Sequence, residues 1–210
     1  MQGFILQITK SIKEDVLVKL ITTKHYYTLY RFYGARHSIL YAGRNIDFEV
    51  EYQGIYIPKL RNIFHIAREY EQDLEKVYIW QQFCSLLDKH LQEPNSHEPK
   101  EIPPFYYTML ENGVRKLKKQ QAKRVACCMY AELLEFEGRL YQKENCFICD
   151  NKLEKKIAIT RGFLLAHPAC VHSPALLDRD SVMKFYATKN LINFNNEECA
   201  NLYQIVLEGL

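Results

Sequence analysis

Four potential metal ligands with matched spacing constrain the fold of this 210-residue chain more than any other feature. Cys146 and Cys149 are separated by two residues, and after seventeen further residues His167 and Cys170 repeat that spacing. Two such pairs, each on a tight turn, can converge tetrahedrally, as a closed structural zinc site requires. The pattern therefore predicts a compact zinc knuckle over residues 146–170.

Two alternatives to this ligand set remain open. The first is two unrelated pairs of buried cysteines, because free cysteine is commonly buried. The second is His172 in place of His167, although the two-residue spacing to Cys170 favours His167. The other four cysteines lie on apolar faces of expected helices, where we expect them to pack in the core: Cys84, Cys127, Cys128 and Cys199.

Cysteine use and segment hydropathy indicate a reducing compartment. Seven cysteines are an odd number and cannot all pair as disulfides. The first residues lack a basic segment followed by an apolar stretch, so we expect no signal peptide. The longest uncharged run, residues 162–177, contains Pro168 and Pro174 and is unsuited to a membrane-spanning helix. We therefore predict a cytoplasmic protein with reduced thiols.

Residues 1–66 have the pattern of short strands. Ile46, Phe48 and Val50 alternate with acidic residues, which is typical of an antiparallel strand with one buried face. Glycines recur at intervals of roughly ten residues, as turns or bulges do in a small barrel; they are Gly34, Gly43 and Gly54. A five-stranded barrel over about 65 residues fits this pattern.

Beyond residue 66 the apolar period becomes helical. Three- and four-residue steps that include Tyr70 and Leu74 predict a helix from Ala67 to Leu91. The proline-rich segment 93–104 predicts an exposed loop. Further helices are expected from Phe105, over 122–136, from Ser173–Pro174 to about Lys189, and from Asn195 or Asn196 towards Leu210. We therefore predict an α+β chain with a barrel at 1–66 and a helical domain at 67–210, into which the knuckle at 146–170 is inserted.

The barrel segment is both basic and aromatic. Residues 1–66 contain nine Lys or Arg against five Asp or Glu, whereas the whole chain has a net charge of only +3. Aromatic residues between His25 and Tyr33 fall on both strand faces, Tyr26, Tyr30 and Phe32 on one and Tyr27 and Tyr33 with Arg31 on the other. One set can fill the barrel while the other stacks on unpaired bases. The alternative is that one set packs in the barrel and the other against neighbouring helices.

A second basic cluster follows Gly113. Its members are Arg115, Lys116, Lys118, Lys119, Lys123 and Arg124. Such a cluster is either a solvated helix face or a contact for phosphates or an acidic peptide. The sequence has no phosphate-binding glycine loop, nucleophile elbow or metalloprotease helix, so we predict that the protein is not an enzyme.

The chain resembles the RecO family of bacterial DNA-repair proteins over nearly its whole length in layout. The resemblance rests on four features in order: Gly3-Phe4-Ile5-Leu6, Gly34-Ala35-Arg36, the turn from Leu40 to Gly43, and the knuckle at 146–170. Two positions depart from the family pattern. His167 stands where a cysteine is common, and Asp150 stands where a glycine is usual.

The resemblance implies an OB-fold barrel, a structural Zn²⁺ ion and a role in homologous recombination. The implied activities are binding of single- and double-stranded DNA, annealing of complementary strands and, with RecR, loading of RecA onto DNA coated by single-strand binding protein. The implied location is the bacterial cytoplasm, at the nucleoid when DNA is bound.

The resemblance also implies positions for some of the contacts. It places Arg36 near the DNA face, and from charge and strand position we add Arg31, Arg44, Lys59 and Arg61. In this family the acidic, hydrophobic tail of the single-strand binding protein docks on the helical domain. We place that contact near Lys116, Lys119, Lys123 and Arg124.

Two other functions compete with this one. The first is a protein-interaction adaptor with a structural zinc site that does not bind DNA, in which the barrel aromatics are all core. The second is a nuclease or other metalloenzyme, which needs an open metal position that four protein ligands do not leave.

Overall fold

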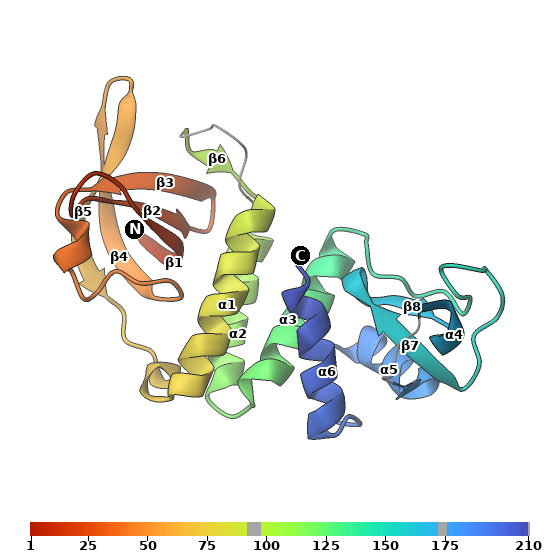
Figure 1. Ribbon diagram of the computed structural model, residues 1–210. Coiled ribbons are helices and arrows are strands. Elements are labelled where there is room, and N and C mark those ends of the chain that lie inside the picture. The colour runs from red at the N-terminus through yellow and green to blue at the C-terminus, as the bar shows by residue number, and fades with distance from the viewer. Residues whose placement is uncertain (92–97, 172–175, 210) are drawn as a thin grey trace. The chain divides into compact units, whose positions relative to one another are not determined.

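The computed structural model describes residues 1–91, 98–171 and 176–209 (Figure 1). The chain forms two compact units, Met1–Lys119 and Gln120–Leu210. This division falls later than the expected boundary at residue 66, because two helices that follow the barrel pack against its first strand. Each unit is described below by itself.

Five strands form a closed barrel in the first unit, as the sequence predicts. They are β1 Gln2–Lys10, β2 Val16–Ile21, β3 His25–Arg31, β4 Asn45–Gln53 and β5 Tyr56–His65. Antiparallel pairs join β1 to β2 and β4, β2 to β3, and β4 to β5. A parallel pairing of β3 with β5, in register at Tyr30 and Lys59, closes the ring. The barrel is therefore OB-like, followed by helices in the same unit.

Alternate residues of the strands fill the barrel. Its buried cluster includes Ile5, Val18, Leu20, Leu29, Phe48 and Leu60. A short 3₁₀ turn at Gly34–Arg36 follows β3. The period-2 pattern of the sequence and the closed sheet thus agree, because each strand turns one face to the interior.

Helix α1 spans Leu74–Leu91 and begins seven residues later than the sequence predicts. Residues Glu69–Gln72 form a 3₁₀ turn instead, and this turn carries the buried Tyr70. Asp73 then caps the helix, since its carboxylate accepts hydrogen bonds from the backbone N–H of Glu75 and Lys76. Leu74, expected on the core face, is 85% exposed. The helical spacing of Tyr70 was misleading because a 3₁₀ turn can also point a side chain into the core.

Gly43 is the point where α1 and the preceding turn meet the barrel. Its carbonyl oxygen accepts hydrogen bonds from the Tyr70 hydroxyl at 2.7 Å and from the Trp80 indole N–H at 2.9 Å. Its φ is +90°, and a Cβ built there would lie 2.6 Å from Cδ1 of Trp80. Only glycine fits this position without displacing the indole.

The first unit ends with a two-residue strand and a helix. Strand β6, Lys100–Glu101, pairs with the start of β3. Helix α2 spans Phe105–Leu117, as expected from the sequence. Of the expected loop at 93–104, residues 93–97 fall outside the described residues, and the described part contains β6.

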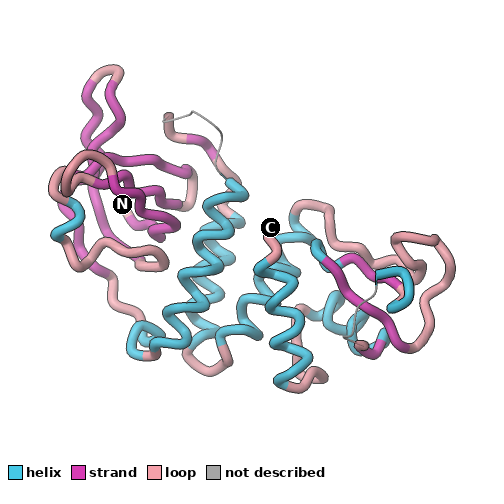
Figure 2. The backbone as a smooth tube through the Cα atoms, in the orientation of Figure 1, coloured by secondary structure: helices cyan, strands magenta, loops and turns pink. Residues whose placement is uncertain are grey.

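The second unit combines helices with a small sheet, as the tube in Figure 2 shows. Its elements are α3 Ala122–Phe136, β7 Lys156–Thr160, a 3₁₀ turn at Arg161–Phe163, β8 Leu164–Ala166, α4 Pro168–Val171, β9 Leu177–Asp178, α5 Arg179–Thr188 and α6 Asn196–Leu207. The sheet has the order β8-β7-β9. Tyr130, Phe163, Phe185 and Tyr186 form an aromatic core, in which the Tyr186 hydroxyl donates to the Phe163 carbonyl oxygen at 2.7 Å.

The starts of the last two helices test two sequence predictions. Asn195 caps α6 in a reciprocal capping box with Glu198, which confirms the expected start. Helix α5 starts at Arg179, and the Asp178 carboxylate caps it by accepting a hydrogen bond from the backbone N–H of Ser181. The expected start at Ser173–Pro174 is therefore wrong. Those two residues themselves lie outside the described ones, and strand β9 separates them from the helix.

The four cysteines outside the knuckle, namely Cys84, Cys127, Cys128 and Cys199, are all buried, as expected for core residues. Among the described residues, none of the helices is long and apolar enough to cross a membrane.

Candidate metal centre and aromatic groove

The knuckle brings its four predicted ligands together. Cys146 and Cys149 lie in a turn that is closed by hydrogen bonds from Cys146 N to Asn151 O and from Asp150 N to Cys146 O. His167 directly follows β8, and Cys170 lies in the short helix α4 that comes next. A hydrogen bond of 2.9 Å from Phe147 N to Leu165 O joins the first turn to β8 and so holds the first pair against the second. The tight-turn arrangement predicted from the spacing is therefore present.

Asp150 explains why glycine is usual at its position. Its φ is +56°, in the left-handed region that glycine adopts at the least cost. Asp is among the residues that tolerate this region. Its carboxylate also accepts a hydrogen bond from the Asn145 side chain at 3.3 Å. The departure from the family pattern therefore leaves the turn intact.

The donor atoms have the spacing that a tetrahedral metal site requires. The four ligand atoms all lie within 4.8 Å of one another. Nδ1 of His167 is 3.3 Å from Sγ of Cys149 and 4.0 Å from Sγ of Cys170. Zinc–sulfur bonds of about 2.3 Å in a tetrahedron separate the ligand atoms by roughly 3.8 Å. The cluster can therefore hold a metal ion without rearrangement of the fold, and its donor set suits zinc.

A hydrogen bond outside the cluster orients the histidine. Nε2 of His167 lies 3.0 Å from the carbonyl oxygen of Lys152, so this nitrogen carries the proton and donates it. Nδ1 then presents its lone pair to the three sulfurs. Such outer contacts fix the tautomer and the ring orientation of metal-binding histidines. The geometry supports His167 as the fourth ligand, while the competing His172 lies outside the described residues.

Backbone groups favour the thiolate form of Cys146. Burial acts to raise the pKa of this thiol, but hydrogen bonds from the backbone N–H groups of Cys149, His167 and Ile148 outweigh burial and lower the pKa to about 6. One of these is the 3.4 Å contact from His167 N to Sγ. Because the thiolate is the metal-binding form of cysteine, the turn prepares this residue for a cation.

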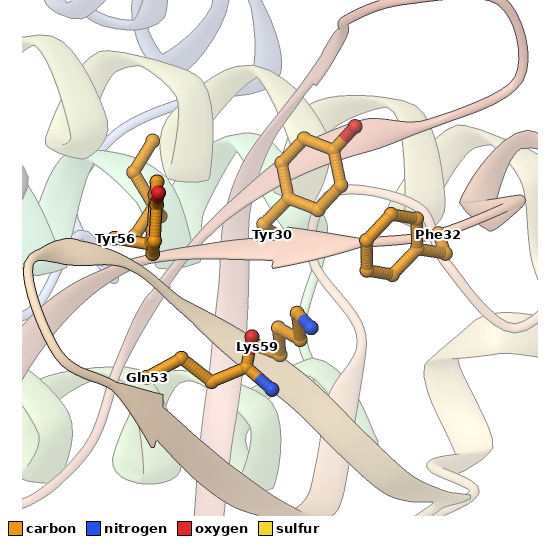
Figure 3. A pocket seen from close by; sticks show the side chains of 6 residues that line it. Tyr30, Phe32, Gln53, Tyr56 and Lys59 are labelled. Atoms are coloured by element: carbon orange, nitrogen blue, oxygen red, sulfur yellow. The ribbon is translucent and has the colours of Figure 1, made fainter.

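A groove opens on the barrel where β3 and β5 meet. It encloses about 380 Å³ and is lined by Tyr30, Phe32, Gln53, Tyr56, Ile57 and Lys59. Figure 3 shows Tyr30 on β3 and Phe32 just after its end, with Gln53 contributed by β4 and Tyr56 and Lys59 by β5. We call these six residues the aromatic groove.

The aromatic residues of β3 divide along the strand rather than between its faces. Tyr27 packs in the barrel core, while the Tyr26 hydroxyl donates to Asp88 of α1 at 2.7 Å. At this end of β3 both faces are therefore packed. At the other end Tyr30 and Phe32 line the aromatic groove, and Tyr33 is exposed. The structure thus confirms packing at one end of β3, while base stacking at the other end stays a prediction.

The comparison with known families decides what this barrel is. Residues 1–71 match the family model described as RecO N terminal. The N-terminal barrel is therefore similar to the N-terminal domain of RecO proteins. RecO proteins take part in recombination, with DNA and other recombination proteins as their partners. No curated protein matches the chain.

The RecO barrel places its five candidate DNA contacts in different environments. Arg31 donates to the Leu60 carbonyl oxygen at 3.0 Å, and burial lowers its pKa. Arg44 lies over the Tyr41 ring at 3.8 Å, donates to Ser38 O at 2.9 Å, and has a side chain only 18% exposed. Both guanidinium groups therefore hold the fold together.

The other three candidates of the RecO barrel reach the surface. Arg36 is 67% exposed and forms an ion pair with Glu14 at 2.5 Å. Arg61 pairs with Glu51 at 2.6 Å, and the ammonium group of Lys59 lies 5.0 Å from the centroid of the Phe32 ring. Exchange of these pairings for phosphate oxygens is chemically straightforward, because surface ion pairs are weak.

The second basic cluster is divided between the two units. Lys116 and Lys119 belong to the first unit, whereas Lys123 and Arg124 begin α3 in the second. Arg124 donates to the carbonyl oxygens of Leu191 and Phe194 at 2.7 Å each. This guanidinium thus joins α3 to the segment before α6, and its structural task was not evident from the charge pattern.

Proposed function

We propose that this protein is a non-enzymatic recombination mediator that binds single- and double-stranded DNA and anneals complementary strands. With RecR, it would help load RecA onto DNA coated by single-strand binding protein. The observation that carries this proposal is the match of the barrel to the RecO N-terminal family.

Charge neutralisation is the physical basis of the proposed annealing. The barrel segment carries an excess of basic residues, and Arg36, Lys59 and Arg61 reach its surface. Lys and Arg that bind phosphates release condensed counterions and reduce the repulsion between two strands. Strands held in this way pair through their own bases, so that no catalytic group is needed.

In this proposal the metal is a structural Zn²⁺ ion. Cys146, Cys149, Cys170 and His167 would hold it, and four protein ligands leave no open position for substrate or water. The ion would fix the knuckle of the second unit without taking part in a reaction.

The proposed partner contact is with the tail of the single-strand binding protein. We retain Lys116, Lys119 and Lys123 as candidates for this acidic segment, and Arg124 contributes less because its guanidinium binds backbone carbonyls. Peptide binding measured for Lys119→Glu and Lys123→Glu variants tests this contact, and undiminished affinity in both would contradict it.

Salt dependence tests the DNA-binding mechanism. Anisotropy of a labelled single strand should show affinity falling steeply between low and moderate salt. Arg36→Glu should weaken binding several-fold and reduce the slope of log K against log salt by about 1, because an exposed phosphate contact is lost. A complementary labelled strand, added to the same samples, measures annealing.

Lys184→Glu is the matched control for this experiment. It changes the net charge by the same amount as Arg36→Glu. Lys184, however, is an exposed residue of α5 in the second unit and does not belong to the barrel. We expect its affinity to stay close to that of the unmodified protein. Affinity that does not depend on salt would contradict phosphate neutralisation, and absence of any DNA binding would favour the protein-interaction adaptor.

A further inference from the structure

The aromatic groove arises from the way the barrel closes. Strands β3 and β5 pair in parallel at Tyr30 and Lys59. The β4–β5 hairpin continues beyond this point to its turn, where Gln53 pairs with Tyr56 and Gly54 has a φ of +57°. Figure 1 shows this hairpin projecting from the barrel. The groove therefore has one wall on β3 and another on the projecting hairpin.

The β3 wall is ordered by contacts among its own side chains. The Tyr30 hydroxyl donates to the carboxylate of Asp15, and this hydrogen bond is the main reason that the pKa of Asp15 is lowered. The Tyr30 and Phe32 rings meet edge to face, with centroids 5.0 Å apart, and Lys59 lies over Phe32. A wall fixed in advance loses little side-chain entropy when a ligand binds.

The hairpin wall presents an exposed ring and an amide. Tyr56 is 74% exposed although it is a large aromatic residue. The Gln53 amide donates to Glu51 at 2.5 Å, which holds the side chain at the groove and leaves its carbonyl oxygen as an acceptor. Figure 3 shows Tyr56 and Gln53 on the hairpin beside the Tyr30–Phe32 pair.

These groups fit one chemical class of ligand. Aromatic faces on both walls suit a flat heteroaromatic ring, the Gln53 amide suits the polar edge of such a ring, and Lys59 suits a single phosphate. The carboxylate of Glu51 offsets the positive charges of Arg61 and Lys59. The groove is thus suited to bind a base more than to follow a phosphate backbone.

We propose that the aromatic groove binds one unpaired nucleotide, with its base packed against Tyr56 and the Tyr30–Phe32 pair, and that it thereby gives the barrel a preference for single-stranded over duplex DNA. A base inside a duplex is stacked and paired, so its faces cannot reach these rings. This inference rests on the proposed DNA-binding function. It assigns to Tyr56 the task of discriminating between the two forms of DNA.

The test compares two exposed aromatic residues of the same strand. Tyr56 lines the groove, whereas Phe64 is 68% exposed and lies at the other end of β5. Anisotropy is measured with a labelled single strand and with the duplex of the same sequence, for the unmodified protein, Tyr56→Ala and Phe64→Ala. Tyr56→Ala should weaken single-strand binding about tenfold and leave duplex binding within about twofold, because one stacked base is lost. Phe64→Ala should change neither affinity.

A chemically altered strand shows whether the base is the group recognised. Wild-type protein should bind a single strand with abasic residues about as weakly as Tyr56→Ala binds the intact strand. The affinity of Tyr56→Ala for the abasic strand should be little lower than its affinity for the intact strand, because the two changes remove the same contact. Tyr56→Phe should keep the single-strand affinity.

The outcomes separate this inference from the function on which it rests. If Tyr56→Ala lost affinity equally for both DNA forms, or for neither, the inference that the groove binds a base would be overturned. DNA binding by the wild-type protein would be unaffected by that result. A Tyr56→Ala variant with unchanged DNA affinity but weakened binding to a partner protein would assign the groove to a peptide and overturn the inference. Binding of neither DNA form by the wild-type protein contradicts the proposed function itself.

Discussion

If the cluster holds zinc as proposed, replacing Cys146 by serine should abolish metal binding and unfold the knuckle of the second unit. Cys146 is buried, and its thiolate receives hydrogen bonds from the backbone around it. Structural zinc contributes about 10–16 kcal/mol to the folding of isolated zinc-finger peptides. The second unit also has its aromatic core, so we expect a smaller loss, of at least about 3 kcal/mol. For a unit of this size that lowers the Tm by roughly 12–24 °C.

Metal content and thermal unfolding of the same samples check this prediction. Cys199→Ala is the control, since Cys199 is a buried cysteine of the same unit outside the cluster. It should keep about one zinc ion per chain, the number that a single four-ligand site holds. A strong chelator should reproduce the effect of Cys146→Ser. Full metal content in Cys146→Ser, or an unchanged Tm after chelation, would contradict the role of this cluster.

The pH dependence of the same transition has a definite sign. The pKa of Cys146 is lowered to about 6, below that of an ordinary thiol. The thiolate therefore stabilises the folded state, and this stabilisation is complete at pH values above the pKa of an ordinary thiol. This contribution is lost as the pH falls through about 6. Metal release and loss of the knuckle should therefore accompany acidification, and metal content measured across a pH series tests it.

Replacing Asp88 by alanine should cause a large loss of stability in the first unit. Asp88 is 3% exposed on α1, where it accepts from the Tyr26 hydroxyl at 2.7 Å and from the Lys19 ammonium group at 3.3 Å. Burial and Asp88 together raise the pKa of Tyr26, so its hydroxyl stays protonated and remains a donor. Loss of the carboxylate leaves a buried hydroxyl without its acceptor and Lys19 without this ion pair. We expect about 3 kcal/mol of destabilisation.

Denaturant unfolding measures this loss. Asp88→Asn retains an acceptor oxygen for Tyr26 but lacks the charge opposite Lys19, so its loss should be smaller. Lys89→Ala, an exposed change at the next residue of α1, should stay within about 0.5 kcal/mol of the unmodified protein. If Asp88→Ala and Lys89→Ala were equally stable, the carboxylate would not join α1 to the barrel.

The four-ligand cluster could be predicted because its geometry is largely local. Two ligands on one turn need only a short spacing, and the sequence shows that spacing twice, at Cys146 and at His167. The proton position on His167 could not be predicted. It depends on the carbonyl oxygen of Lys152, which has no sequence signature.

The aromatic groove was only partly predictable because it depends on contacts between distant strands. Alternation placed Tyr30 and Phe32 on one face of β3, but the opposite wall requires β5 to pair with β3 at Lys59. Tyr56 and Gln53 were therefore missed. The turn between them, with Gly54 after an alternating strand, was a usable signal for a projecting hairpin.

The helix starts show where pattern and structure diverge. Residues 67–73 continue the helical apolar period, but the backbone forms a 3₁₀ turn before Asp73 caps α1. Ser173 and Asp178 are both good capping residues, and sequence alone did not reveal which one a helix follows. Pairing of β9 with β7 places Leu177 and Asp178 in a strand directly before the helix, and this pairing is a contact between distant segments.

The hydrogen bonds to the Gly43 carbonyl oxygen show that the barrel makes contacts with residues beyond the end of the RecO match. Trp80, one of the two donors, lies beyond residue 71, where the match ends. A fragment cut there would expose the ring of Phe4, which packs against Trp80, and would lose the helix that supplies Asp88. A fragment that keeps these contacts would end after Lys119, the last residue of the first unit. The family match thus ends at residue 71, whereas the compact unit that contains the barrel includes two further helices and ends at Lys119.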